Sequence, residues 1–305
     1  MRRAFIQTLT QLADAEPRLL LLTADLGFSV IEPFAHRFPN RFFNVGVAEQ
    51  NMVGIASGLA DAGFIPFIYS ITPFLVLRPL EFIRNGPVQH QLPVRLVSVG
   101  GGFEYGPAGH SHHGLEDLAV LRTLPGLVVT APADPLQAVT ILSQTLYHPG
   151  PVYFRLGKDE ESILPELEGR FRMGGAERIG CGKDLLLITT GSQSIETQRA
   201  AALLLEQGVA CSLLVVACLA PAPVEDLRLA MVDIPVVITV EEHVLAGGLG
   251  SLTAEVIAES GWSRRFLRLG VSTLDNKSGN HAWLKNKHGL SAPAITQQVM
   301  EFMAK

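Results

Sequence analysis

Short runs of continuous apolar residues alternate with helical patterns along the chain, and this alternation limits the possible folds more than any other feature. Residues 19–23 read Leu-Leu-Leu-Leu-Thr. Further strands are expected at 42–45, 64–69, 94–99, 127–130 and 152–155, and helices over 1–14, from 49, over 74–86 and over 134–146. Pro79 predicts a kink or a late start in the third helix. Apolar strands separated by helices indicate a parallel sheet covered on both faces.

The pattern pauses at residues 159–182, which are rich in charge, Gly and Pro and are predicted to form a linker. A second unit follows, with strands expected near 185–190, 210–216, 235–240 and 265–270 and a helix over 291–303. We therefore expect two three-layer α/β/α domains with mainly parallel sheets, 1–158 and 183–305.

Composition excludes several classes of protein. The net charge is −5 and the chain has no basic run, which argues against a nucleic-acid partner. It has neither a signal peptide nor an apolar span of 18 residues, so no membrane partner is expected. The three cysteines lack the spacing of a metal site and are typical of free thiols in a reducing cytoplasm.

Polar, aromatic and glycine residues follow consecutive predicted strands. In a parallel α/β sheet, ligands bind beyond the carboxyl ends of the strands. The residues that fall there are Asp25, Ser29, Glu49, Phe74, Gly100 to Gly102, Tyr105, His112, His113 and Arg155. Their gathering at one edge predicts a site in the first domain.

Glu49 opens a helix whose neighbouring residues are small or apolar. Its carboxylate lies near the positive end of the helix dipole. We expect it to be poorly solvated, which favours the neutral form. The alternative from the local pattern alone is a carboxylate that only caps its helix.

Two other motifs are less specific. The turn Gly100-Gly101-Gly102 could approach a phosphate with its amides, but it matches no nucleotide-binding fingerprint, and a flexible loop is the simpler interpretation. His110, His112 and His113 form a cluster without neighbouring Cys or paired carboxylates. Substrate binding or proton transfer is therefore expected there rather than a metal site in this chain.

The residues alone lead to a two-domain α/β enzyme, and a resemblance extends this interpretation. Residues 42–52, 70–85, 106–117 and 131–134 resemble the pyrimidine-binding domain of transketolases. Residues 187–192, 240–243 and 247–250 resemble the start and later motifs of their C-terminal domain. The resemblance covers nearly the whole chain, in order.

The resemblance implies a thiamine diphosphate enzyme that lacks one part. Transketolases bind the diphosphate, with Mg²⁺ or Ca²⁺, through an N-terminal domain with a Gly-Asp-Gly motif and a downstream Asn. The chain has no such segment and resembles the C-terminal half of a split transketolase. We expect it to be inactive alone and to pair with an N-terminal subunit in an α2β2 assembly. The N-terminal subunit is expected to ligate the metal.

The family's cofactor contacts can be assigned to residues of this chain. Glu49 matches the glutamate that binds N1′ of the aminopyrimidine and favours the imino tautomer, whose nitrogen removes the thiazolium proton. Phe74 lies in the aromatic patch that stacks on the pyrimidine, and Phe82 is a second candidate for the same patch. Asp25 matches an aspartate near the cofactor.

The family's substrate contacts are assigned in the same way. His112 matches the histidine of a Thr-His motif that contacts donor oxygens, with Ser111 in place of Thr. Ser29 and Arg155 match positions that bind the substrate phosphate. His110 and His113 are further substrate-binding candidates.

Two departures concern the substrate. Ala108 replaces the aspartate that senses the donor's C2 hydroxyl, and Gly100 lies where a phosphate-binding histidine is usual. Tyr105 and His110 are candidates to replace these contacts. The expected donor is therefore a ketose or 2-oxo compound other than the standard sugar phosphates.

Three functions remain open after the resemblance. The first is transfer of a two-carbon ketol unit between sugars or sugar phosphates, in carbohydrate metabolism. The second is a pyruvate-using thiamine enzyme that resembles 1-deoxyxylulose-5-phosphate synthase or a 2-oxoacid dehydrogenase β subunit. The third is a non-catalytic partner. Glu241, Glu242 and His243 of the second domain are expected to be packing or interface residues.

Overall fold

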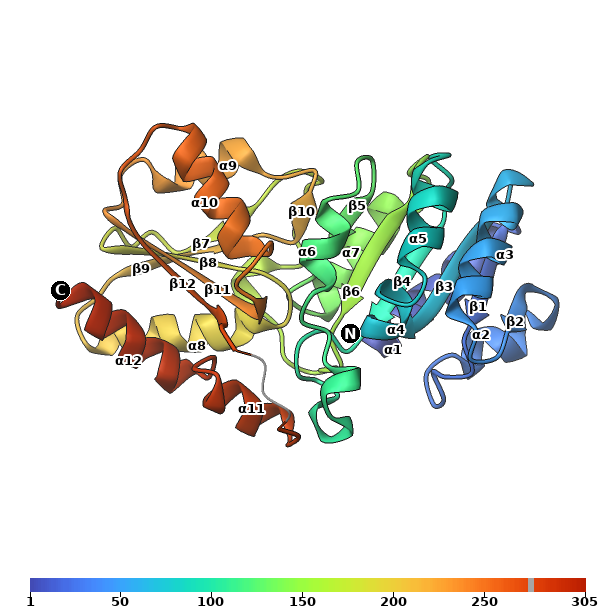
Figure 1. The fold of residues 1–305 in the computed structure, drawn as a ribbon, viewed down its shortest axis with the longest axis horizontal. Helices are drawn as coiled ribbons and strands as arrows, with labels where there is room; N and C mark the ends of the chain where they lie inside the picture. The colour runs from blue at the N-terminus through green and yellow to red at the C-terminus, as the bar shows by residue number, and fades with distance from the viewer. Residues whose placement is uncertain (274–276) are drawn as a thin grey trace.

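The computed structural model describes residues 1–273 and 277–305. Two α/β units lie side by side, the N-terminal one in blue to green and the C-terminal one in yellow to red (Figure 1). The first contains a seven-stranded sheet in the order β10-β5-β6-β4-β3-β1-β2, and the second a five-stranded sheet in the order β12-β11-β8-β9-β7. Both sheets are mainly parallel and flanked by helices, so the predicted fold class is confirmed.

Most strands of the first sheet coincide with the predicted apolar runs. They are β1 Leu19–Thr23, β2 Phe42–Asn44, β3 Ile65–Ile71, β4 Arg95–Val99, β5 Val128–Thr130, β6 Val152–Leu156 and β10 Cys218–Ala220. Every residue of β1, β4 and β6 is buried. Burial on both faces explains why these strands read as continuous rather than alternating apolar sequence.

Helices cover the two faces of this sheet, as Figure 1 shows. One face carries α1 Arg2–Ala15, α2 Glu32–Arg37 and α7 Pro135–Thr145. The other carries α3 Glu49–Asp61, α4 Thr72–Val76, α5 Leu80–Ile83 and α6 Asp117–Arg122. The short helical turns η1 Pro39–Arg41, η2 Arg84–Val88, η3 Gly106–Ala108 and η4 His110–His112 lie in the connections.

The helix predicted over 74–86 is interrupted, as Pro79 predicts. α4 ends at Val76 and α5 begins at Leu80. Proline has no backbone N–H and its ring clashes with the preceding turn. The break leaves Arg78 in a short loop on the side of the sheet where α3 begins.

The second unit repeats the layered arrangement. Its strands are β7 Glu177–Ile179, β8 Leu185–Thr189, β9 Cys211–Val215, β11 Val236–Val244 and β12 Arg265–Val271. α8 Gln193–Glu206 and α12 Ala292–Met303 cover one face, and α9 Val224–Met231 and α10 Leu249–Glu259 cover the other (Figure 1). α11 His281–Lys287 lies beside η3 of the first unit.

The boundary between the units differs from the prediction. β7 lies inside the predicted linker and pairs antiparallel with β9. It has one buried residue, Ile179, so it lacks the apolar run that would reveal it. β10 comes from the second unit's sequence but pairs antiparallel with β5 of the first sheet. The second unit's sequence thus adds a strand to the first unit's sheet.

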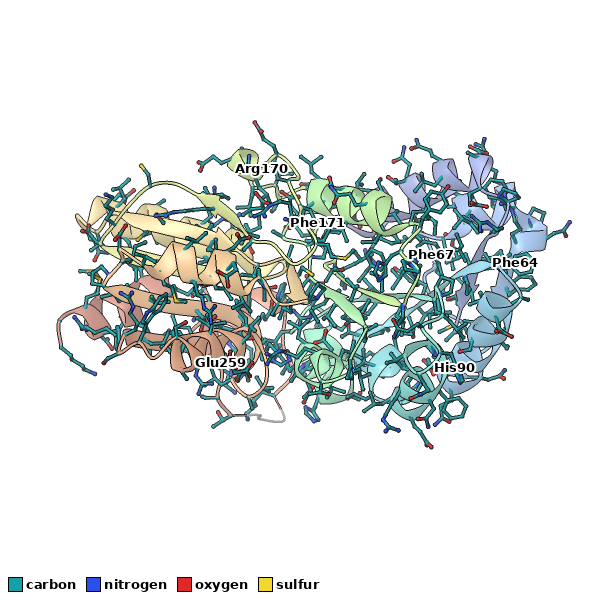
Figure 2. All side chains as sticks on the ribbon, turned by 90° about the horizontal axis from the view of Figure 1, so that it is seen from above. Phe64, Phe67, His90, Arg170, Phe171 and Glu259 are labelled. Atoms are coloured by element: carbon teal, nitrogen blue, oxygen red, sulfur yellow. The ribbon has the colours of Figure 1, made fainter. Side chains whose placement is uncertain are left out.

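The rest of the linker, with η5 Pro165–Leu167, is attached to α7. Gln137 Nε2 donates to the carbonyl of Arg170 at 2.8 Å, and Gln144 Nε2 donates to that of Phe171 at 3.3 Å. Phe171 is buried, whereas Arg170 is exposed (Figure 2). Among the described residues, no helix is long and apolar enough to cross a membrane.

Candidate active site

The strand order places β2, β1, β3, β4 and β6 in one continuous parallel stretch of sheet. The loops that follow these strands therefore meet at one edge. They carry most of the residues predicted from sequence, and the structure shows which of them contact each other.

Glu49 is the first residue of α3 and is 3% exposed. It faces an open hollow of about 640 Å³ lined by residues 47–51 and Arg78. Ser70 Oγ donates to its carboxylate at 3.3 Å, and Arg78 Nη1 lies 2.9 Å from Oε2. The expectation of burial is met, but the surroundings are not purely small and apolar, because a guanidinium contacts the carboxylate.

Arg78 was not among the predicted site residues. It lies in the break before Pro79, where Gln50 Nε2 donates to its carbonyl at 3.2 Å. Its Cζ lies 3.9 Å from the centroid of the Phe74 ring. The arginine thus joins Glu49 to Phe74. The proline that follows it marked the loop in the sequence, but nothing there indicated the direction of the side chain.

A row of aromatic contacts continues from Phe74. The His112 ring lies 4.8 Å from it at 71°, and Tyr105 lies 6.3 Å from His112. Lys158 Nζ lies 4.1 Å from the Tyr105 ring centroid. Ser111 Oγ is 3.0 Å from His112 Nδ1, so a hydrogen bond can orient the imidazole. Glu49, Arg78, Phe74, His112, Tyr105 and Lys158 form what we call the edge row.

The glycine turn after β4 shapes this row rather than offering free amides. Gly100 has φ +79°, and a Cβ there would collide with the Tyr105 ring. Its N–H donates to the Leu156 carbonyl at 3.0 Å, and that of Gly102 donates to Gly114 at 2.6 Å. Because these amides are already bonded, a phosphate cradle at this turn is not favoured.

Asp25 and Ser29 lie in the loop after β1. Asp25 has φ +55°, and Asn44 Nδ2 donates to its Oδ1 at 2.9 Å. The side-chain oxygen of Asn44 also accepts from the backbone N–H of Asp25 and of Gly46, each at 3.0 Å. Asn44 therefore fixes the loop from β2 to Glu49 against Asp25. Ser29 is exposed, and its N–H donates to Glu32 Oε1 at 2.6 Å.

The three histidines of the predicted cluster lie in different surroundings. His110 is exposed, and His112 belongs to the edge row. His113 is 4% exposed, packs against Phe103 at 5.1 Å, and has an unpartnered Nε2. Burial lowers the pKa of His113. In the described part of the chain, no three His, Cys, Asp or Glu side chains are arranged to hold a metal ion.

Phe82 lies apart from the edge row. It is 42% exposed and lines a separate hollow of about 290 Å³ beside Gly54 and Asn85. The break at Pro79 separates it from Phe74. The placement does not support the prediction that Phe82 joins Phe74 in one aromatic patch.

The placement of Arg155 favours a structural role over the predicted role in substrate binding. It is 5% exposed. Its Nε donates to Asp117 Oδ2 at 2.8 Å, and its Nη2 donates to the carbonyls of Gly114 and Glu242 at 2.7 and 3.1 Å. Tyr153 Oη also donates to Asp117, at 2.7 Å. Since these donors are directed at protein groups in both units, Arg155 crosslinks the units.

Glu241, Glu242 and His243 are buried where the two units meet. Glu241 accepts hydrogen bonds from the N–H groups of Leu249 and Gly250 at the start of α10, and burial raises its pKa to about 7. Glu242 accepts from the Phe103 N–H at 2.8 Å and pairs with His281. These contacts fit the packing role expected from sequence.

The two units and the edge row define a two-unit α/β protein with a candidate site at the carboxyl edge of its first sheet. The family model "Transketolase, pyrimidine binding domain" matches residues 1–161, and "Transketolase, C-terminal domain" matches residues 174–295. The chain belongs to the transketolase family and corresponds to its C-terminal half, as in the split transketolases.

Individual relatives agree with this assignment. A putative transketolase C-terminal section of Methanocaldococcus jannaschii is 36% identical over 100% of this chain and 96% of its own length. One subunit of the apulose-4-phosphate transketolase of Phocaeicola vulgatus is 32% identical over 100% of this chain and 97% of its own length. A solved structure described as a split gene transketolase, inactive β4 tetramer, superposes with a TM-score of 0.87 at 34% sequence identity. The superposition covers 99% of this chain and 97% of that one.

Proposed function

We propose that the chain is the pyrimidine-binding subunit of a split, thiamine diphosphate-dependent transketolase. Together with an N-terminal subunit it transfers a two-carbon ketol unit from a ketose donor to an aldehyde acceptor. The observation that carries this proposal is the buried Glu49 carboxylate at the start of α3, joined through Arg78 to the Phe74 ring and facing an open hollow.

The residues present fit an aminopyrimidine. A flat heteroaromatic ring needs a stacking partner, which Phe74 offers, and a hydrogen-bonding group in its plane. Glu49 supplies a carboxylate 3% exposed, with Ser70 Oγ beside it at 3.3 Å. Stacking on an aromatic ring contributes about 1 kcal/mol. The cofactor, when bound, supplies the nucleophilic carbon and the electron sink for cleaving the bond beside the donor carbonyl.

The chain's own residues then perform three tasks. Glu49 holds a proton at the pyrimidine nitrogen. Phe74 fixes the ring plane. His112, which Ser111 can orient through Nδ1, is the candidate to bind a donor oxygen through its other ring nitrogen. Asp25, Ser29 and His110 line the more exposed part of the edge and are the remaining candidates for cofactor or substrate contacts.

The partner subunit is part of the proposal. Exposed apolar side chains lie in the loops at this edge of the sheet: Val47, which lines the hollow, is 70% exposed, Leu77 beside Arg78 in the chain is 46% exposed, and Phe28 in the loop after β1 is 73% exposed. Apolar surface concentrated at a site favours an interface there. The partner would cover this surface and hold the diphosphate with Mg²⁺ or Ca²⁺, and an α2β2 assembly is expected. The Phocaeicola vulgatus relative is itself named as a subunit of a transketolase, which supports such pairing.

The test is ketol transfer by the co-purified two-subunit complex with thiamine diphosphate and Mg²⁺. Glu49→Gln should lower the rate by about 100-fold or more, because an acid–base contribution is lost. Glu81→Gln, an exposed carboxylate on α5, is the control and should leave the rate unchanged. An unchanged rate in Glu49→Gln would instead favour a silent partner subunit.

The choice of donor tests the substrate class. A panel of ketoses, with and without phosphate, should include the best donor. If pyruvate were clearly the best donor, the synthase-like or dehydrogenase-like alternative would replace ketol transfer. Substantial turnover by this chain alone would refute the need for a partner.

A further inference from the structure

Arg78 stacks on Phe74 and bonds to Glu49, and these are the two contacts that the proposed function assigns to a bound ring. Its planar guanidinium lies over Phe74, with Cζ 3.9 Å from the ring centroid. Its Nη1 also donates to both Glu49 oxygens, at 3.1 and 2.9 Å. A flat ring stacked on this face of Phe74 and bonded to Glu49 needs the same space.

Of the two partners, Arg78 is the one that can leave. Its side chain is 44% exposed, whereas that of Glu49 is 2% exposed. Arg78 lies in the loop between α4 and α5, and it borders the open hollow of about 640 Å³. A long side chain next to such a space can swing into solvent without moving the sheet or α3.

Removing a donor from a buried carboxylate is unfavourable unless another donor replaces it. A ring nitrogen that shares with Glu49 one proton, taken up from solvent as the guanidinium departs, meets this condition. The exchange keeps Glu49 paired throughout.

We propose that Arg78 closes the ring site while the cofactor is absent, holding Glu49 in place and giving way to the aminopyrimidine when the cofactor binds. The inference rests on the proposed function and adds a competing side chain to it. Arg78 is thus a positioning residue that acts through Glu49 and opposes cofactor binding.

The experiment is a calorimetric titration of thiamine diphosphate, with Mg²⁺, into the two-subunit complex. Arg78→Met keeps much of the side chain's length but loses the planar charged head. Its Kd should be about threefold or more lower than that of the wild type, as expected for loss of one partly exposed ion pair. Arg84→Met, an exposed arginine whose head group contacts Asn85, is the matched control and should keep the wild-type Kd.

A double-mutant cycle tests the route through Glu49. In a Glu49→Gln background the guanidinium has no carboxylate to hold it, so Arg78→Met should change Kd by clearly less. The temperature of unfolding gives a second measurement: thiamine diphosphate should raise it more in Arg78→Met than in the wild type. The larger rise is expected because, without cofactor, Arg78→Met has a buried Glu49 carboxylate that lacks its cation.

Equal or weaker binding by Arg78→Met, or an undiminished gain in the Glu49→Gln background, would overturn the inference. Either result would leave the proposed function intact, since wild-type binding would still be observed. If neither the wild type nor Arg78→Met bound thiamine diphosphate, the proposed function would fail, and the inference with it.

Discussion

Replacing Arg155 with Met tests whether this residue binds substrate or holds the two units together. The variant loses the 2.8 Å ion pair with Asp117 and the hydrogen bonds to the carbonyls of Gly114 and Glu242. Asp117 is 2% exposed and keeps its bond from Tyr153, but it loses its cation. Breaking a buried pair from one side costs about 3–5 kcal/mol.

The magnitude can be measured by thermal unfolding of the full chain, followed by circular dichroism. At about 2 °C per kcal/mol for a chain of this size, the melting temperature should fall by roughly 6–10 °C. Arg37→Met is the control, since Arg37 and Asp14 form an exposed pair worth less than about 1 kcal/mol.

A second variant separates charge from packing. Adding Asp117→Asn removes the uncompensated carboxylate, so the double variant should be more stable than the sum of the two single losses predicts. The reasoning is refuted if Arg155→Met unfolds like the Arg37 control yet raises KM for a phosphorylated donor in the assembled enzyme. That outcome would support the predicted role of Arg155 in binding substrate.

Two further predictions concern the glycine turn and the contact between the units. Gly100→Ala should lose about 1–3 kcal/mol of stability, because φ is +79° and the new Cβ meets the Tyr105 ring; Gly58→Ala, in open space on α3, should lose none. Burial lowers the pKa of His281, but the Glu242 carboxylate outweighs it, and the net pKa is raised above 6.5. Its stabilising contribution is therefore complete below pH 6.5 and is lost as pH rises through the raised value. His281→Gln should flatten the fall in melting temperature as the pH rises above 6.5, and equal slopes in both proteins would contradict a protonated pair.

The sequence predicted the fold where burial determines the residue pattern. β1, β4 and β6 are buried on both faces, and their continuous apolar runs are typical of interior strands. β7 and β10 were missed because each has three residues at a sheet edge. Their pairing depends on contacts with distant segments, which no local pattern encodes.

The site was predicted to the level of the loop but not of the side chain. Glu49 was singled out by its place after a strand and at the start of an apolar helix, but its role was assigned through the family resemblance, because a carboxylate at a helix start can also be a simple cap. The prediction put Phe82 beside Phe74 because it assumed one continuous helix. The chain leaves the helix between Val76 and Leu80, and helical spacing does not carry through a proline. Arg78 was missed for the same reason.

The two arginines show why residue type at a strand end is insufficient to assign a role. Arg155 was the stronger candidate for a ligand from its position at the end of β6, yet its donors are directed at buried protein oxygens. Arg78, outside any strand, is 44% exposed and faces the hollow. What decides is whether the donors of a guanidinium are already committed to protein groups. The Nε and Nη2 groups of Arg155 are bonded to protein oxygens in both units, whereas Arg78 can exchange one partner for another at the surface. We therefore infer that Arg78, which can make that exchange, belongs to the proposed site, and that Arg155 belongs to the scaffold that supports it.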